Sequence, residues 1–132
     1  MRKLLVLFVL FWSMISFSQQ SNWQIYTVID GVKFESTIIE CSDNEILTFR
    51  FSNSNNYPVT VVWNEEVWID GVCKQSGESE EDRRELDLFS NEVVSGSCDF
   101  KSSFYIGSKV NRGSRVMLLT HFDLKNIQVL KQ

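Results

Sequence analysis

Residues 23–41 read WQIYTVIDGVKFESTIIEC, and this stretch decides the fold. An Asp-Gly pair at residues 30–31 separates two runs that are rich in Val, Ile, Thr and aromatic residues. Asp-Gly supplies the positive φ angles that a two-residue hairpin turn needs. Apolar and charged residues alternate from Val32 to Glu35, which is typical of a half-buried strand. The stretch therefore predicts an antiparallel β-hairpin.

The pattern of short apolar runs between turn residues continues along the chain. In residues 45–52, Leu47, Phe49 and Phe51 share one face of a predicted strand. A second Asp-Gly pair, at residues 70–71, predicts another tight turn. Further strands are expected at residues 59–63, 67–69, 86–88, 93–100, 102–106, 116–120 and 122–130.

Two segments lack this strand character. Residues 75–84 are expected to form an exposed loop or a short helical turn, and residues 107–114 a polar connection. The alternation of the last run changes phase after Asn126, which indicates a β-bulge. About eight short strands with regularly spaced turns predict an all-β, antiparallel, immunoglobulin-like β-sandwich in one domain, residues 19–132.

The composition narrows the possible functions. The chain has 132 residues, with 13 Lys+Arg against 17 Asp+Glu and a net charge of −4. The lack of Ala beside many aromatic and β-branched residues disfavours a helix bundle. The acidic balance disfavours nucleic-acid binding, which needs a basic surface. A single His excludes most His-based catalysis and most transition-metal sites.

The N-terminus resembles an export signal. A short basic start at Arg2-Lys3 precedes an apolar run at residues 4–12, and small residues follow it. These features predict a signal peptide of residues 1–18, and a mature protein that is periplasmic, on the cell surface or secreted. The alternative is a membrane anchor, which needs ~20 apolar residues, whereas Ser13 interrupts this run. No membrane span is expected after cleavage.

Three cysteines lie in the predicted mature chain, at Cys41, Cys73 and Cys98. Disulfides persist in oxidising compartments, and an odd number allows one internal bridge with one thiol left over. The expected strand directions bring all three to one end of the sandwich and do not select the pair. A zinc site is the alternative, but no Cys-x-x-Cys or His-x-x-His spacing is present, so neither a metal nor a cofactor is predicted.

No constellation of catalytic residues is evident. His121 has Asp123 on the same strand face, but residues 96–98 do not fit a nucleophile elbow. A Cys–His pair is conceivable, although nothing in the sequence lowers a thiol pKa. The acidic residues 78–85 lack the spacing of a calcium loop and contain two arginines. The sequence therefore predicts no catalytic centre.

Three tryptophans of the predicted mature chain suggest a binding surface. Trp63 continues the alternation of Val59 and Val61 and is expected to be buried. Trp68 follows an acidic pair and is expected to be exposed. Flat indole rings can stack against sugars, so Trp68 and Trp23 are the candidate binding residues.

Four segments, at residues 39–41, 67–73, 94–98 and 119–127, carry a likeness to other proteins. They resemble an uncharacterised group of small exported proteins of Bacteroidota bacteria. In that group a second cysteine follows, three positions on, the one matching Cys73, whereas this chain has Ser76 there. The resemblance implies a Cys41–Cys98 disulfide with Cys73 as the free thiol, and it implies no known activity.

The sequence as a whole predicts an exported, non-catalytic module that acts through contacts with a protein or cell-surface partner. The alternative is a carbohydrate- or small-ligand-binding domain that uses exposed tryptophan, and an enzyme comes third. Trp23 and Trp68 projecting together into solvent would favour the carbohydrate hypothesis. A deep pocket holding His121 with a carboxylate would instead favour an enzyme.

Overall fold

The structure, a computed structural model, describes residues 22–132. The predicted signal peptide of residues 1–18 lies outside this range. Within residues 22–132, no helix has the length and apolar character needed to cross a membrane. The strands are β1 (Gln24–Ile29), β2 (Val32–Cys41), β3 (Asn44–Asn53), β4 (Val59–Ile69), β5 (Val72–Ser76), β6 (Arg83–Leu88), β7 (Val93–Ser95), β8 (Tyr105–Arg112) and β9 (Arg115–Lys131). Two short 3₁₀ helices are η1 (Glu80–Asp82) and η2 (Ser102–Phe104).

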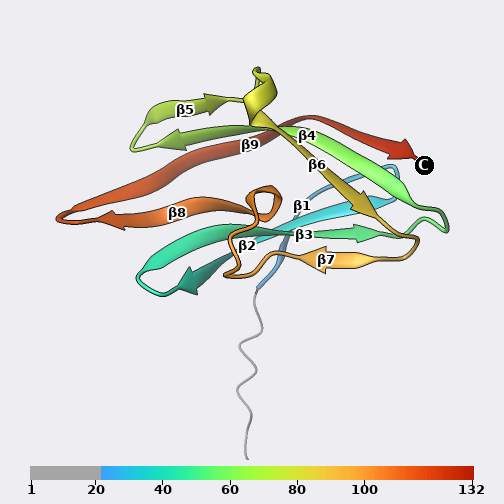
Figure 1. The fold of residues 1–132 in the computed structure, drawn as a ribbon, viewed down its shortest axis with the longest axis horizontal. Helices are drawn as coiled ribbons and strands as arrows, with labels where there is room; N and C mark the ends of the chain where they lie inside the picture. Colours follow the sequence, from blue (N-terminus) through green and yellow to red (C-terminus); the bar gives the residue numbers. More distant parts are fainter. Residues whose placement is uncertain (1–21) are drawn as a thin grey trace, which may run out of the picture.

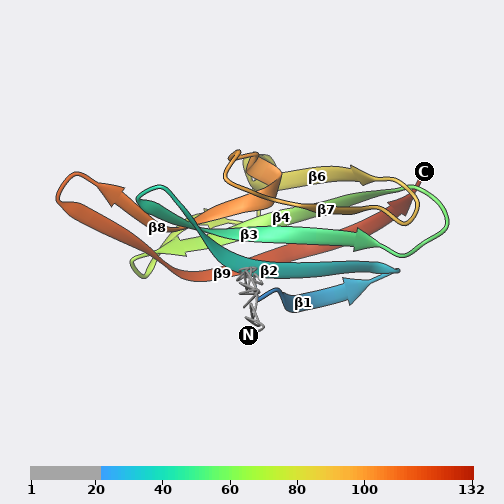
Figure 2. The ribbon, with the colours of Figure 1, turned by 90° about the horizontal axis from the view of Figure 1, so that it is seen from below.

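All of the paired strands run antiparallel. Their order across the sheet is β1-β2-β3-β8-β9-β4-β5. In addition, β6 pairs with β4 and β7 pairs with β3. Figure 1 shows β4 and β5 above β2, β3 and β7, while the β8–β9 hairpin extends to one side. Figure 2, seen from below, places β1 at one edge of the molecule. The curled sheet therefore has two halves that face each other, and the expected all-β antiparallel class is confirmed.

The tight turns follow from local chemistry. Residues 30–31 have φ angles of 45° and 77°, and residues 70–71 have 51° and 75°. Both Asp-Gly turns thus adopt positive φ at both central positions, as a type I′ hairpin turn requires. Asn126 has a φ of 52°, and the β4–β9 register shifts between Val62 and Asn64. The bulge predicted near Asn126 is confirmed.

Aromatic side chains from the two halves meet in the core. The rings of Phe51 on β3 and Trp63 on β4 have centroids 5.0 Å apart, and those of Phe49 and Phe122 are 6.0 Å apart. Trp63 is fully buried, as the alternation predicted. The buried core comprises Val32, Phe34, Leu47, Phe49, Phe51, Val59, Val61, Trp63, Val67, Leu88, Ile106 and Leu124.

The C-terminal third differs most from the sequence expectation. The predicted polar connection at residues 107–114 is wrong, because β8 continues to Arg112 between β3 and β9. The two strands expected at 116–120 and 122–130 form the single strand β9. β9 is continuous because its first residues pair with β8 and the remainder pairs with β4. The strand expected at 93–100 ends at Ser95.

A disulfide joins Cys41, at the end of β2, to Cys98, in the segment after β7, with a Cα–Cα distance of 5.5 Å. This is the pair that the resemblance implies. Cys73 is free and exposed on β5, in the other half of the sheet. The disulfide therefore closes a loop within one half and does not link the two halves.

Candidate functional site

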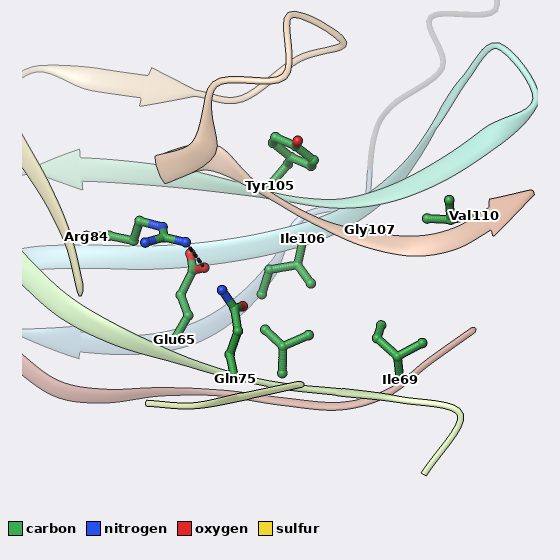
Figure 3. A pocket seen from close by; sticks show the side chains of 9 residues that line it. Glu65, Ile69, Gln75, Arg84, Tyr105, Ile106, Gly107 and Val110 are labelled. Atoms are coloured by element: carbon green, nitrogen blue, oxygen red, sulfur yellow. Dashed lines mark ion pairs between the residues drawn. The ribbon is translucent and has the colours of Figure 1, made fainter. Parts of the chain in front are cut away.

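A cleft of about 240 Å³ opens between β4, β5 and β8 (Figure 3). A carboxylate and a guanidinium form its polar end, where Nη2 of Arg84 lies 3.3 Å from Oε2 of Glu65. Glu65 is only 2% exposed, and the Arg84 side chain is 18% exposed. The lining residues are Glu65, Val67, Ile69, Gln75, Arg84, Tyr105, Ile106, Gly107 and Val110.

The position of Glu65 follows from the strand periodicity of β4. Successive side chains on a strand point to opposite faces, so Glu65 shares its face with Trp63 and Val67, both of which lie in the core. The sequence interpretation treated the two adjacent glutamates as an interruption, but β4 passes through them without a break. Arg84 on β6 lies opposite Trp63 in the register, so its side chain reaches the same region.

Burial raises the pKa of Glu65 to about 7. The Arg84 guanidinium and the indole N–H of Trp63 act in the opposite direction, and the carboxylate of Asp82 raises the pKa further. Asp82 is itself 5% exposed and accepts hydrogen bonds from the backbone N–H groups of Gly77 and Ser79. The Glu65 carboxyl group therefore changes its charge near neutral pH.

Nε of Arg84 is a buried polar atom without a hydrogen-bond partner among residues 22–132. The indole N–H of Trp63 lies close enough to the Glu65 carboxylate to lower its pKa through a hydrogen bond. The Nη1 group of Arg84 is satisfied, since it donates to the carbonyls of Glu81 and Arg83. Most buried polar groups in folded proteins are paired, and each unpaired one costs about 1–3 kcal/mol. The ion pair with Arg84 and the hydrogen bond from Trp63 only partly offset the burial of the Glu65 carboxylate.

A second group of side chains, here called the outer-face cluster, consists of Glu66, Trp68, His121, Asp123 and Lys125. Trp68 on β4 lies opposite His121 on β9, and their ring centroids are 6.4 Å apart in an edge-to-face arrangement. The indole N–H of Trp68 donates to Oε1 of Glu66 at 2.7 Å, and Glu66 also pairs with Lys125. The His121 side chain is 57% exposed.

Hydrogen bonds and ion pairs link the charged side chains of the outer-face cluster to one another and to their neighbours. Hydrogen bonds from Lys125 and then from Trp68 lower the pKa of Glu66. Glu66 in turn raises the pKa of Lys125. The hydroxyl group of Tyr26 on β1 donates to Asp123, and burial together with this bond raises the pKa of Tyr26. The outer-face cluster is therefore anchored to three strands.

The two tryptophans singled out from the sequence do not share a surface. Trp68 lies in the outer-face cluster, whereas the ring of Trp23 lies 4.6 Å from Cζ of Arg50 on β3. Arg50 donates two hydrogen bonds to Glu35 of β2, at 2.7 and 2.9 Å. Trp23 thus packs on the other half of the sheet, and both tryptophans are only partly exposed.

The structure gives little geometric support to the catalytic and metal sites that were considered from the sequence. Cys73 on β5 and His121 on β9 both lie opposite Trp68, which separates them by two strand spacings, or ~9.5 Å. The thiol and the imidazole are thus too far apart for a hydrogen bond. Of the acidic residues 78–85, Asp82 is buried by its contacts to backbone N–H groups. Within residues 22–132, no three His, Cys, Asp or Glu side chains gather in a way that suits a metal ion.

Comparison with protein-family models, with curated proteins and with solved structures finds no match to this chain. The geometry of the cleft and of the outer-face cluster therefore carries the functional argument. Sequence reasoning identified Trp68 and His121 separately, and it missed Glu65 and Arg84.

Proposed function

We propose that this protein is an exported, non-catalytic binding module of immunoglobulin-like β-sandwich architecture that acts through protein contacts at the outer-face cluster. The observation that carries the proposal is the partly exposed Trp68–His121 pair, which Glu66 and Lys125 hold from one side. The ionic side chains around the pair supply a polar rim.

This arrangement has the anatomy of a protein interface. Binding energy at interfaces concentrates in a few residues, among which Trp, Tyr and Arg are enriched, and polar groups surround them. The hydrogen bond from Trp68 to Glu66 restrains the indole before any partner arrives. A restrained side chain loses less conformational entropy on binding, which favours affinity.

Carbohydrate binding is the second candidate function, and one observation favours it. The carboxylates of Glu66 and Asp123 lie opposite each other in the register beside the Trp68 ring. An indole face next to hydrogen-bond acceptors suits a sugar ring, whose faces carry C–H groups and whose edges carry hydroxyl groups. Trp23 adds nothing to this surface, because it packs against Arg50.

The sandwich and export parts of the proposal have separate support. Two sheet halves enclose one core, as in a sandwich, although β9 pairs within both halves. The basic start and apolar run before Ser13 suit a signal peptide, and the disulfide suits an oxidising compartment. N-terminal sequencing of the protein from producing cells should give a chain that begins at Gln19, and an intact Met1 would contradict export by cleavage.

Site-specific photo-cross-linking in producing cells tests the protein-contact proposal. A photoreactive phenylalanine analogue replaces Trp68 in one variant and Trp23 in a matched control. We expect a discrete protein adduct from position 68 and none from position 23, and we expect His121→Ala to weaken that adduct. Equal adducts from both positions, or none at position 68, would contradict the proposal.

The same tryptophan pair distinguishes the carbohydrate alternative. The variants Trp68→Ala and Trp23→Ala are each titrated with a panel of soluble oligosaccharides, with intrinsic fluorescence as the readout. One result would favour carbohydrate binding over protein contact as the function of the outer-face cluster. It is saturable sugar binding that Trp68→Ala abolishes and Trp23→Ala leaves intact.

A further inference from the structure

We propose that the partner of the outer-face cluster presents an extended, uncharged peptide segment that adds a strand to the unpaired end of β2. An apolar side chain of that segment enters the groove beside this end. The inference rests on the proposed function, because it names the chemistry of the protein partner proposed there. Two features of residues 37–41 carry it: a free backbone edge and an adjoining apolar groove.

The edge of β2 that faces β1 is paired over only half of its length. β1 pairs with residues 32–36 of β2, whereas β3 pairs with all of residues 32–41. β2 thus continues past the start of β1 (Figure 1), and among residues 22–132 no strand pairs with residues 37–41 on that side. An unpaired strand edge is a template for pairing with another chain.

The register of the β2–β3 hairpin shows which backbone groups face the free edge. Cys41 and Asn44 flank a two-residue turn and form a hydrogen-bonded pair, and such pairs alternate along an antiparallel ladder. The odd-numbered residues of this end therefore direct their N–H and C=O groups to β3, and Ile38 and Glu40 direct theirs to the free edge. The sulfur of Cys98 lies 3.6 Å from the carbonyl oxygen of Glu40, which leaves both groups of Ile38 and the N–H of Glu40 for a partner.

An apolar groove of about 410 Å³ lies beside this edge. Ile38, Leu47 and Phe122 line it from β2, β3 and β9. Leu47 belongs to the buried core, yet its register partner Ile38 is 56% exposed, so the inner face of the sheet is uncovered at this corner. None of the described residues that line the groove carries a charge. The inward-facing side chain of an added strand is therefore expected to be apolar.

The strands at the two ends of the sheet order carry features that oppose pairing. β1 has a register shift between Ile25 and Thr27, and β5 presents the exposed Lys74. Bulges and lysines are devices by which natural sheets prevent edge-to-edge association. Residues 37–39 read Thr-Ile-Ile and pair with β3 without a shift, so this end of β2 lacks both devices.

The groove adjoins the outer-face cluster at the edge of β9. Phe122, which lines the groove, lies between His121 and Asp123 of the cluster. Tyr26 of β1 contacts both sides, since its ring centroid lies 5.8 Å from that of Phe122 and its hydroxyl group donates to Asp123. One partner can therefore contact the cluster and pair with the end of β2. In this mode of recognition, backbone pairing supplies affinity and the groove supplies specificity.

A blocked pentapeptide, acetyl-Thr-Leu-Thr-Leu-Thr-amide, is the probe for the added strand. Amide hydrogen exchange of the mature, disulfide-bonded protein is measured with and without the peptide at millimolar concentrations. Without peptide, the amides of Ile38 and Glu40 should exchange faster than that of Ile39, which pairs with β3. Saturating peptide should slow exchange at Ile38 and Glu40 about tenfold and leave Ile39 unchanged. No effect of the peptide would overturn the proposal.

Two sets of controls show whether the peptide binds as a strand in the groove. Alternate amides of an extended peptide face the same edge, so N-methylation of either the leucine or the threonine amides, but not of both sets, should abolish the effect. Equal losses would overturn strand pairing. Ile38→Glu places a charge in the groove and should weaken binding about tenfold, whereas Ile25→Glu, at an exposed position of β1, should not. Thermal midpoints establish that both variants fold.

Photo-cross-linking in producing cells separates this inference from the proposed function. The photoreactive phenylalanine analogue is placed at position 38 in one variant and at position 68 in another, and we expect adducts of the same mass. An adduct at position 68 alone would overturn the added strand and retain the outer-face cluster as the contact site. An adduct at position 38 alone would contradict the contact at the cluster and retain the groove. A cross-link to a second copy, or within one chain, would overturn the partner segment as the occupant.

Discussion

Replacing Glu65 with Gln should stabilise the protein at alkaline pH and leave its stability nearly unchanged in mild acid. Glu65 is 2% exposed, and burial raises its pKa to about 7 from the usual value of 4.5. Gln has the shape of the protonated carboxyl group and cannot ionise. The Gln side chain therefore mimics the protonated form of Glu65, which burial in the folded protein favours.

The sign and the size of the effect follow from proton linkage. Between about pH 4.5 and 7 the folded state binds the Glu65 proton and the unfolded state releases it, so stability falls as the pH rises through this range. The pKa difference of 7 minus 4.5, at about 1.4 kcal/mol per pH unit, amounts to about 3 kcal/mol. Glu65→Gln should recover up to about this amount above pH 7.

Urea denaturation followed by tryptophan fluorescence, at about pH 5 and about pH 8, measures the difference in the free energy of unfolding between variant and wild type. Groups common to both proteins, such as the paired Glu35, cancel in this difference. Cys73→Ser in both backgrounds prevents thiol exchange at the higher pH. Glu85→Gln removes an exposed carboxylate on β6 and is the matched control variant.

The reasoning fails if Glu65→Gln changes stability by the same amount at both pH values. That result would mean that Glu65 stays ionised in the folded protein throughout the range. Destabilisation at about pH 8 would be a stronger contradiction, because it would make the Glu65–Arg84 ion pair a net stabilising contact.

Three further predictions concern the rest of the fold. Cys98→Ser should cost about 4 kcal/mol, since the disulfide spans 57 residues, and thiol titration of the wild type should give one thiol before reduction and three after. Arg50→Met should cost about 1–3 kcal/mol near neutral pH, because Glu35 loses its two-point partner. Arg50 lowers the pKa of Glu35, so this cost should shrink as the pH falls through that lowered pKa, and a constant cost in urea titrations would contradict it. Gly96→Ala should lower the thermal midpoint, because an added Cβ would clash with the side chain of Thr48; an unchanged midpoint would show that this segment can move.

Local chemistry explains which parts of the fold the sequence predicts. The turns at residues 30–31 and 70–71 and the bulge at Asn126 each depend on a few neighbouring residues, and all three are present. The course of β9 depends instead on strands that are distant in the sequence. The backbone of its first residues pairs with β8, and that of the remaining residues pairs with β4. Such pairing leaves no signature in the alternation of β9 itself, so its continuity could not be predicted.

The candidate sites likewise combine residues that the sequence identifies with an arrangement that only the pairing of distant strands produces. The sequence identifies Trp68 and His121 as residues of interest, but only the β4–β9 register brings them together. Glu65 was missed although a signal was available. The alternation of inward residues at 59, 61, 63 and 67 includes position 65. A charged residue in phase with a core face is a local conflict, and such conflicts are expected at functional sites.

The three buried carboxylates among residues 22–132 differ in how fully their contacts compensate for burial. Glu35 receives two hydrogen bonds from Arg50, and Asp82 accepts two from backbone N–H groups, so both are accounted for by the fold. The contacts of Glu65 with Arg84 and with the Trp63 indole lower its pKa, but burial outweighs both and raises the pKa to about 7, so Glu65 is the buried carboxylate that the fold compensates least.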